Sequence, residues 1–487
     1  IGYDAGVQLS GSAGATYNTH IGYKAGYGQT NKGYNVSIGA EAGHANGGNT
    51  SVSVGYRAGY SFTGHDSVFL GKSAGESATL FYSAVAIGTY AGRYLAAGGS
   101  NATIVGNNAG MYASGSFNTF IGGNAGQGAT TSAPYSSGTN NTAIGYEALK
   151  RFTTGIENTA LGKGALAFVT TGGSNIGIGL SAGGNTTTAT GNTYIGRSTG
   201  YGNQSGIENV IIGEYSYAHT TGIVNFRNVT TLGSNAGRYA TGSYNTFLGS
   251  YAGQGANTSA PFSSGQYNTA VGYRALEEFT TGGYNSILGQ EAGEKITTGE
   301  SNNLFGYRAG RHITTGNSNI VIGTEALRDE NVSSVVAIGS RAGLYNSGND
   351  NVYLGDTAGR NSGAGADQVI IGHDAGYYAT HDDVVIIGES AGYYATGSSN
   401  VFIGKEAGKG GTTSAPYSSG TTNVAIGKGA LAGFTTGGAN VAIGGGAGDA
   451  LTTGGHNVAI GDNALGAGTS AANNVVVGSR AADAFNG

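Results

Sequence analysis

A nine-residue phrase recurs along this chain, and its recurrence restricts the fold more than any other feature. Residues 423–431, NVAIGKGAL, are one clear copy, and residues 351–359, NVYLGDTAG, are another. There are 28 copies, with an aliphatic residue at the fourth place in all but one, Gly at the fifth in all, and Ala at the eighth in 26. Most successive copies are 16 or 17 residues apart. Such a short fixed period is typical of stacked repeats that bury their apolar faces on one another.

The second to fourth places of the phrase predict a short strand, because apolar residues alternate there with a period of two. A strand, a corner at the Gly, a second stretch through the Ala and a polar turn together use about 17 residues. The sequence therefore predicts an all-β fold, a parallel β-solenoid of 28 coils with about 17 residues per coil. Like places of adjacent coils are expected to stack about 4.7–4.9 Å apart.

Each recurring residue has an expected position in the coil. The fourth-place aliphatic residues, such as Ile144, Val271 and Ile426, are expected to point inward together with the second place, beside an inward column of Ala. The Gly is expected to need a positive φ at a corner. The Asn that usually opens the phrase is expected to form a ladder at a turn, where its amide satisfies backbone groups of adjacent coils.

The third place then faces away from the core, and it is often apolar. Examples are Phe120, Tyr194, Phe247, Ile370, Ile386 and Phe402. A single chain would leave this stripe in water, and apolar patches of more than a few hundred Å² are rare on monomers. Packing of three chains on the stripe would bury it, so the pattern favours a parallel homotrimer.

The repeat predicts one continuous array over residues 1–487 rather than several domains. Three longer insertions, near residues 126–140, 253–267 and 408–422, contain every Pro of the chain. A tolerated surface insertion is the simpler interpretation. The alternative is an aromatic contact loop, because loops on one face of a repeat array are often its binding face. The candidate contact residues are Pro134, Tyr135, Pro261, Phe262, Pro416 and Tyr417.

Composition excludes several functional classes. The chain has 96 Gly but no Gly-X-Y period and only three Pro, which excludes collagen. Its 22 basic residues are scattered and its net charge is -5, so no nucleic-acid partner is expected. It has no Cys, hence no disulfide framework, and no apolar run long enough for a membrane span. Because it begins inside a phrase, we expect it to be part of a longer protein.

Motifs for chemistry are weak. Residues 177–182, GIGLSA, match a dinucleotide-binding loop, but they lie inside the repeat without a βαβ unit. The densest polar cluster is His381 beside Asp382 and Asp383, and no His recurs at metal-ligand spacing. We therefore predict no catalytic, cofactor-binding or metal-binding residue and no enzymatic activity. The alternative, a polysaccharide-lyase type of enzyme on a β-helix, requires clustered charged residues on one face.

Tyrosine is the aromatic in surplus, with 31 copies and no Trp. Many of these residues follow the corner Gly or lie near the turn. Stacking in ladders is the simpler interpretation. The alternative is a repetitive, weakly binding surface for a glycan or another partner.

The phrase resembles the head repeats of trimeric autotransporter adhesins of the YadA-like group, whose repeat reads Asn-Ser-Val-Ala-Ile-Gly-x-x-Ser. Residues 141–149 and 457–465 carry the likeness most clearly, although Ala replaces the final Ser and the period is longer. Repeat arrays of bacteriophage tail fibres and bacterial surface fibres are similar too. The resemblance implies a left-handed parallel β-roll with three chains side by side.

The function that this resemblance implies is a non-enzymatic structural and adhesive fibre segment, extracellular and at a cell surface. The alternative is the shaft of a bacteriophage tail fibre in a virion tail. The expected partners are other copies of the chain, as a homotrimer or an end-to-end filament, and a glycan or host-cell surface. No cofactor is expected.

Overall fold

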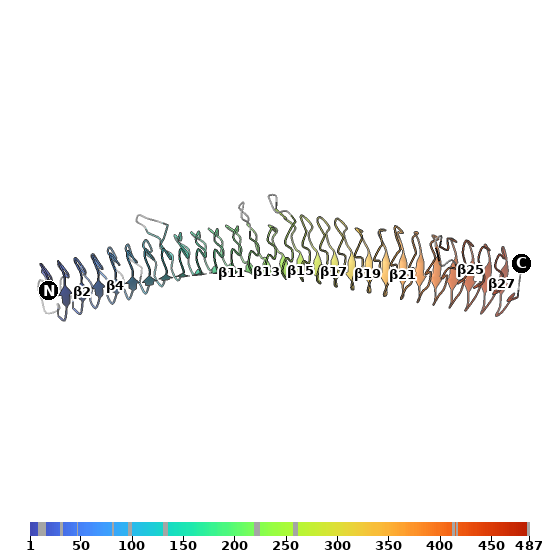
Figure 1. Cartoon of the computed structure of the whole chain (residues 1–487), viewed down its shortest axis with the longest axis horizontal. Coiled ribbons are helices and arrows are strands. Elements are labelled where there is room, and N and C mark those ends of the chain that lie inside the picture. Colours follow the sequence, from blue (N-terminus) through green and yellow to red (C-terminus); the bar gives the residue numbers. More distant parts are fainter. Residues whose placement is uncertain are drawn as a thin grey trace. The chain divides into compact units, whose positions relative to one another are not determined.

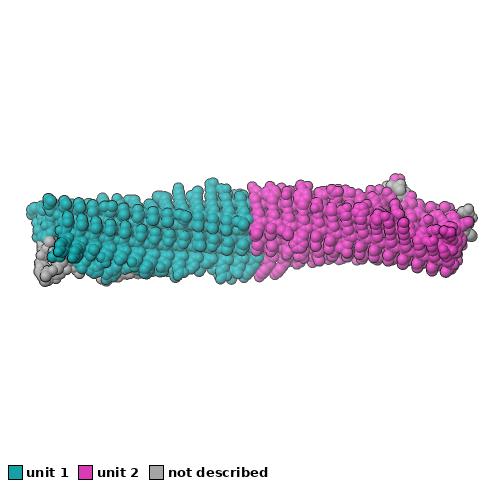
Figure 2. Space-filling model, turned by 90° about the horizontal axis from the view of Figure 1, so that it is seen from below, with its two compact units in different colours: residues 1–245 teal, residues 246–487 magenta. Residues whose placement is uncertain are grey.

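The computed structural model confirms a parallel β-solenoid of about 17 residues per turn (Figure 1). It describes residues 1–7, 16–29, 33–45, 47–79, 82–95, 100–129, 135–218, 225–256, 262–411, 414 and 417–484, and these contain no helix. The chain divides into two compact units, Ile1–Asn245 and Thr246–Gly487 (Figure 2). The single array over residues 1–487 and the count of 28 coils stay predictions.

Unit 1 contains thirteen of the described strands, each three residues long. They are β1 (Thr19–Ile21), β2 (Val36–Ile38), β3 (Val52–Val54), β4 (Val68–Leu70), β5 (Val85–Ile87), β6 (Thr103–Val105), β7 (Thr119–Ile121), β8 (Thr142–Ile144), β9 (Thr159–Leu161), β10 (Ile176–Ile178), β11 (Thr193–Ile195), β12 (Val210–Ile212) and β13 (Thr230–Leu232). Within this unit each strand pairs in parallel with its neighbours, place for place, as in Thr159↔Ile176 of β9 and β10.

Unit 2 contains the other fourteen described strands. They are β14 (Thr246–Leu248), β15 (Thr269–Val271), β16 (Ser286–Leu288), β17 (Asn303–Phe305), β18 (Ile320–Ile322), β19 (Val336–Ile338), β20 (Val352–Leu354), β21 (Val369–Ile371), β22 (Val385–Ile387), β23 (Val401–Ile403), β24 (Val424–Ile426), β25 (Val441–Ile443), β26 (Val458–Ile460) and β27 (Val475–Val477). The pairing rule is the same, as in Val424↔Val441 of β24 and β25.

A buried ladder of Asn side chains precedes the strands, as the sequence predicts. Oδ1 of Asn440 accepts two hydrogen bonds from Asn457, one from its backbone N–H at 3.1 Å and one from its side-chain Nδ2 at 3.0 Å. Nδ2 of Asn440 donates to Asn423 Oδ1 at 3.1 Å and, across the coil, to the carbonyl of Gly454 at 3.0 Å. One amide therefore joins three successive coils and also the two sides of its own coil.

The expected direction of the fourth place is wrong. The middle residue of each strand, at the third place, is buried in β2–β26, whereas the second and fourth places are half-buried or exposed throughout β1–β27. Ile144 and Ile426 are each 36% exposed, and Val271 is half-buried. The physical reason is the Asn ladder: Asn must point inward to reach the opposite backbone, and strand residues alternate, so the third place shares its face.

The third place fills the interior with side chains of very different size. Phe120, Phe247 and Phe402 are fully buried, and each of them contacts a Phe on the next coil, Phe152, Phe279 and Phe434, with ring centroids 5.5, 5.7 and 5.5 Å apart. On that next coil the third place is Ala, as at Ala425. Large and small residues thus compensate one another between neighbouring coils, which keeps a thin interior close-packed. The Ala at the eighth place is buried as predicted, except at Ala5 and Ala481 in the first and last copies.

Candidate functional site

The second and fourth places form an outward stripe of uncharged, mostly β-branched residues on the strand face of each unit. In unit 1 the exposed fraction is 44% at Leu161 and 52% at Leu232, and in unit 2 it is 50% at Leu288 and 67% at Val477 in the last described strand. The second place is mostly Val or Thr, as at Val441 and Thr142. The apolar stripe that the sequence analysis assigned to the third place is therefore present, but it is made by the other two places.

The three insertions place their aromatic residues against the solenoid. Pro134, Pro261 and Pro416 lie outside the described residues. Tyr135 stacks on Tyr94 and Tyr112 in unit 1, and Tyr417 stacks on Tyr378 and Tyr394 in unit 2, with centroid distances from 4.4 to 6.2 Å. Phe262 is only 9% exposed. The rings of Tyr135, Phe262 and Tyr417 thus lie against the coils. A contact role for the insertion residues stays a prediction.

The tyrosines of unit 2 form the larger of these clusters. Tyr377 stacks on Tyr393 at 4.9 Å, beside the stack that contains Tyr378 and Tyr394. Burial, aided by the negative charge of Asp374, raises the pKa of Tyr393 to about 12. Tyrosines of successive coils therefore stack on one another here, as the ladder interpretation of the tyrosine surplus predicts.

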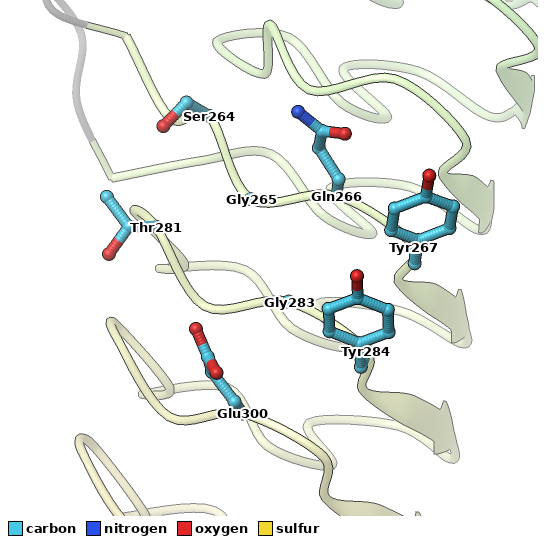
Figure 3. Close-up of a pocket in the computed structure, with 8 residues that line it drawn as sticks. All are labelled: Ser264, Gly265, Gln266, Tyr267, Thr281, Gly283, Tyr284 and Glu300. Carbon is cyan, nitrogen blue, oxygen red and sulfur yellow. The ribbon is translucent and has the colours of Figure 1, made fainter.

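A surface hollow of about 310 Å³ lies on the turns before β15 and β16, and the end of the second insertion forms part of it (Figure 3). Its lining residues are Ser264, Gly265, Gln266, Tyr267, Thr281, Gly283, Tyr284 and Glu300. Figure 3 shows Tyr267 and Tyr284 side by side at the start of successive strands, with both hydroxyls directed the same way. The two rings are 5.0 Å apart between centroids and only 10° from parallel. This pair is not among the contact residues predicted from the sequence.

Charged residues of unit 2 form a ladder of ion pairs. The Glu294 side chain is 1% exposed and lies 2.6 Å from Arg311 Nε and 3.0 Å from Arg274 Nη2. Burial alone would raise the pKa of Glu294, but the hydrogen bond from Arg311 and the neighbouring cations outweigh burial and hold the pKa below its usual value. Glu291 pairs in the same way with Arg308. These carboxylates therefore hold coils together instead of converging on a cleft, as a lyase would require.

The dinucleotide-like motif is explained by packing. Gly177 occupies the inward third place of β10, and a Cβ there would lie 2.7 Å from Leu166 Cγ.

Among the described residues no group of three or more His, Cys, Asp or Glu side chains is arranged to hold a metal ion. Within the same residues no helix has the length and apolar character needed to span a membrane.

Comparison with known proteins gives no match, either to the protein-family models or to the curated proteins. Two features of the described residues are thus candidates for function. One is the outward stripe, which suits assembly, and the other is the tyrosine hollow, which suits a ligand.

Proposed function

We propose that this chain is a non-enzymatic segment of an extracellular fibre, assembled as a parallel homotrimer that acts as a spacer and a multivalent attachment surface. The observation that carries the proposal is the outward stripe. No charged residue occupies its two columns in β1–β27, and its fourth-place side chains are never buried within the single chain. A surface of this kind is typical of a contact between protein chains.

The energetics favour covering the stripe. Burying a fully exposed Ile or Leu contributes about 1.5–3 kcal/mol, so covering a fourth-place residue that is one-third exposed contributes about 0.5–1 kcal/mol. Summed over the coils of one unit, this gain is of the same size as the cost of association, which is about 4–15 kcal/mol. The uniform size of the fourth-place residues suits contact between copies, because like places repeat at the coil spacing on every chain.

The number of copies comes from the resemblance to YadA-like head repeats, in which three chains lie side by side. A bacteriophage tail-fibre shaft, the alternative function, would use the same assembly. The proposed attachment role is supported by the exposed tyrosines on the turns, such as Tyr284, because weak sites repeated along a fibre gain from multivalency.

Sedimentation equilibrium of the purified chain tests the assembly. We expect a single species at three times the 48.2 kDa of one chain, stable on dilution. The physical reason is that the stripes of three chains leave no apolar column in water. A monodisperse species with the mass of one chain would contradict the proposal, and a dimer would contradict its threefold symmetry.

A further inference from the structure

The two tyrosines of the hollow in unit 2 remain well exposed to solvent. Tyr267 is 46% exposed and Tyr284 is 61% exposed, although the rings stack on each other. The next coil has Ser301 at the same place, so no third ring continues the stack beyond Tyr284. The hollow lies beside the two rings, along the turns that precede them, and Glu300 borders it from this next coil (Figure 3).

The polar groups around the rings can both donate and accept hydrogen bonds. Gln266 supplies an amide, Ser264 and Thr281 supply hydroxyls, and Glu300 supplies a carboxylate. All four of these residues are exposed. A flat apolar face with such groups at its edge matches a sugar ring, which has an apolar C–H face and a rim of hydroxyls.

The charge of the hollow restricts the ligand further. Glu300 is the one charged residue in the lining, and among the described residues its carboxylate has no ion-pair partner. An acidic sugar would bring a second negative charge against it without a cation to compensate. The lining therefore favours an uncharged saccharide over one that carries carboxylate or sulfate groups.

A cationic ligand is the main chemical rival, because ammonium groups also bind beside tyrosine and glutamate. Aromatic sites for such cations enclose the charge between rings that face it from several directions. Here the two rings are 10° from parallel and form one wall of the hollow. The geometry suits a flat ring better than a spherical cation.

From this geometry we infer that the hollow binds one ring of an uncharged saccharide, which packs against the exposed surfaces of Tyr267 and Tyr284. The inference rests on the proposed attachment function and names the class of ligand. Ser264, Gln266, Thr281 and Glu300 bind the hydroxyls of the saccharide. Single-site binding is weak, and the copies of the chain in the fibre multiply it.

Titration of the assembled chain with oligosaccharides, followed by saturation-transfer NMR and calorimetry, tests this inference. The probes are cellohexaose, chitohexaose, maltohexaose and mannohexaose, with an alginate hexamer and choline as charged comparisons. We expect at least one uncharged hexamer to bind and the charged probes to bind at least about tenfold more weakly, a difference of about 1.4 kcal/mol. Binding of no uncharged hexamer, or equal binding of alginate or choline, would overturn the inference.

The chain itself supplies a variant that keeps the fold. After the third insertion the same two places carry Thr422 and Ala439, with φ values of 57° against 58° for both tyrosines. The double substitution Tyr267→Thr and Tyr284→Ala therefore installs residues that the coil already accommodates. We expect it to weaken saccharide binding at least about tenfold, and unchanged binding would contradict the assignment.

Two further variants separate a saccharide site from a cation site and from nonspecific stacking on any exposed tyrosine. Tyr345→Ala removes a tyrosine of unit 2 that is 41% exposed but does not line the hollow, and it should leave binding unchanged. Glu300→Gln keeps an acceptor for sugar hydroxyls and should retain most of the binding, whereas a cation site would lose its charge partner. Sedimentation of each variant keeps the two proposals apart, since loss of saccharide binding at an unchanged trimer mass removes only the ligand assignment.

Discussion

Replacing Gly427 by alanine is expected to break the stacking of its coil on the next one. The backbone of Gly427 has a φ of 131°, a region that L-residues rarely adopt, and an added Cβ would lie 2.5 Å from the carbonyl oxygen of Gly444. Neither group is a flexible side chain, so the coils must separate. We expect a loss of more than about 4 kcal/mol in local stability, the range of the most damaging substitutions. Hydrogen exchange of the β24 and β25 amides measures this loss directly.

Gly429→Ala is the matched control, two residues further along the same coil. Gly429 has a φ of 65°, and no atom lies within 4 Å of an added Cβ. Other coils carry non-glycine residues at this place, such as Glu406 with a φ of 58°. We expect a cost of about 1–2 kcal/mol, as for a left-handed conformation alone. Equal effects of the two substitutions would mean that the stacked corner does not exist.

Removing one amide of the Asn ladder is expected to have the next largest effect. Asn440→Val leaves the carbonyl of Gly454 without its donor and the backbone N–H of Asn457 without its acceptor. Each buried group that loses its partner costs about 1–3 kcal/mol, so we expect a total of about 2–6 kcal/mol. Thermal and denaturant unfolding should show this loss at every pH from about 4 to about 8, because valine does not titrate.

Asn440→Asp provides the pH-dependent counterpart at the same place. Its second carboxylate oxygen would face the Gly454 carbonyl and Asn423 Oδ1, both of them acceptors. Burial and these acceptors raise the pKa of the new carboxyl in the folded state, so the folded state binds more protons than the unfolded one. Its stability should therefore fall as pH rises and recover in acid. A pH-independent loss identical to that of the valine variant would contradict the ladder geometry.

Much of the coil could be predicted from the sequence because its repeat carries the information twice, in spacing and in residue type. The period indicated one strand and one corner per coil. The Gly at the fifth place and the Ala at the eighth, such as Gly427 and Ala430, behave as their chemistry requires, with a positive φ and full burial respectively. Ladder formation by Asn follows from the need to satisfy the backbone of a thin coil.

The direction of the strand faces was not predictable from alternation alone, because both faces are apolar. Two signals in the sequence distinguish them. The third place varies from Gly177 to Tyr353, which suits an interior where neighbours compensate, whereas the fourth place is almost always Ile, Leu or Val. A polar Asn two residues before a buried position also fixes the face, once its amide is recognised as an inward group.

The candidate ligand site was not predictable for a different reason. Tyr267, Tyr284 and Glu300 are 17 and 16 residues apart, and only the stacking of coils brings them to one hollow. The proline-containing insertions drew attention to Tyr135 and Tyr417 instead, whose rings turned back onto the solenoid. Prolines thus marked the insertions, but of the two exposed rings one, Tyr267, lies at the end of the second insertion and the other, Tyr284, lies on the coil that follows it.

Thiol accessibility of the outward stripe is the most direct test of the central claim, that copies of this chain cover one another along that stripe. The chain has no Cys, so a substituted cysteine is the only thiol. Ile443 is 37% exposed in the single chain, and Thr453, on the turn of the same coil, is exposed as well. Maleimide should label Thr453→Cys rapidly and Ile443→Cys only slowly until the assembly is denatured. Equally rapid labelling of both thiols in the native protein would contradict the claim.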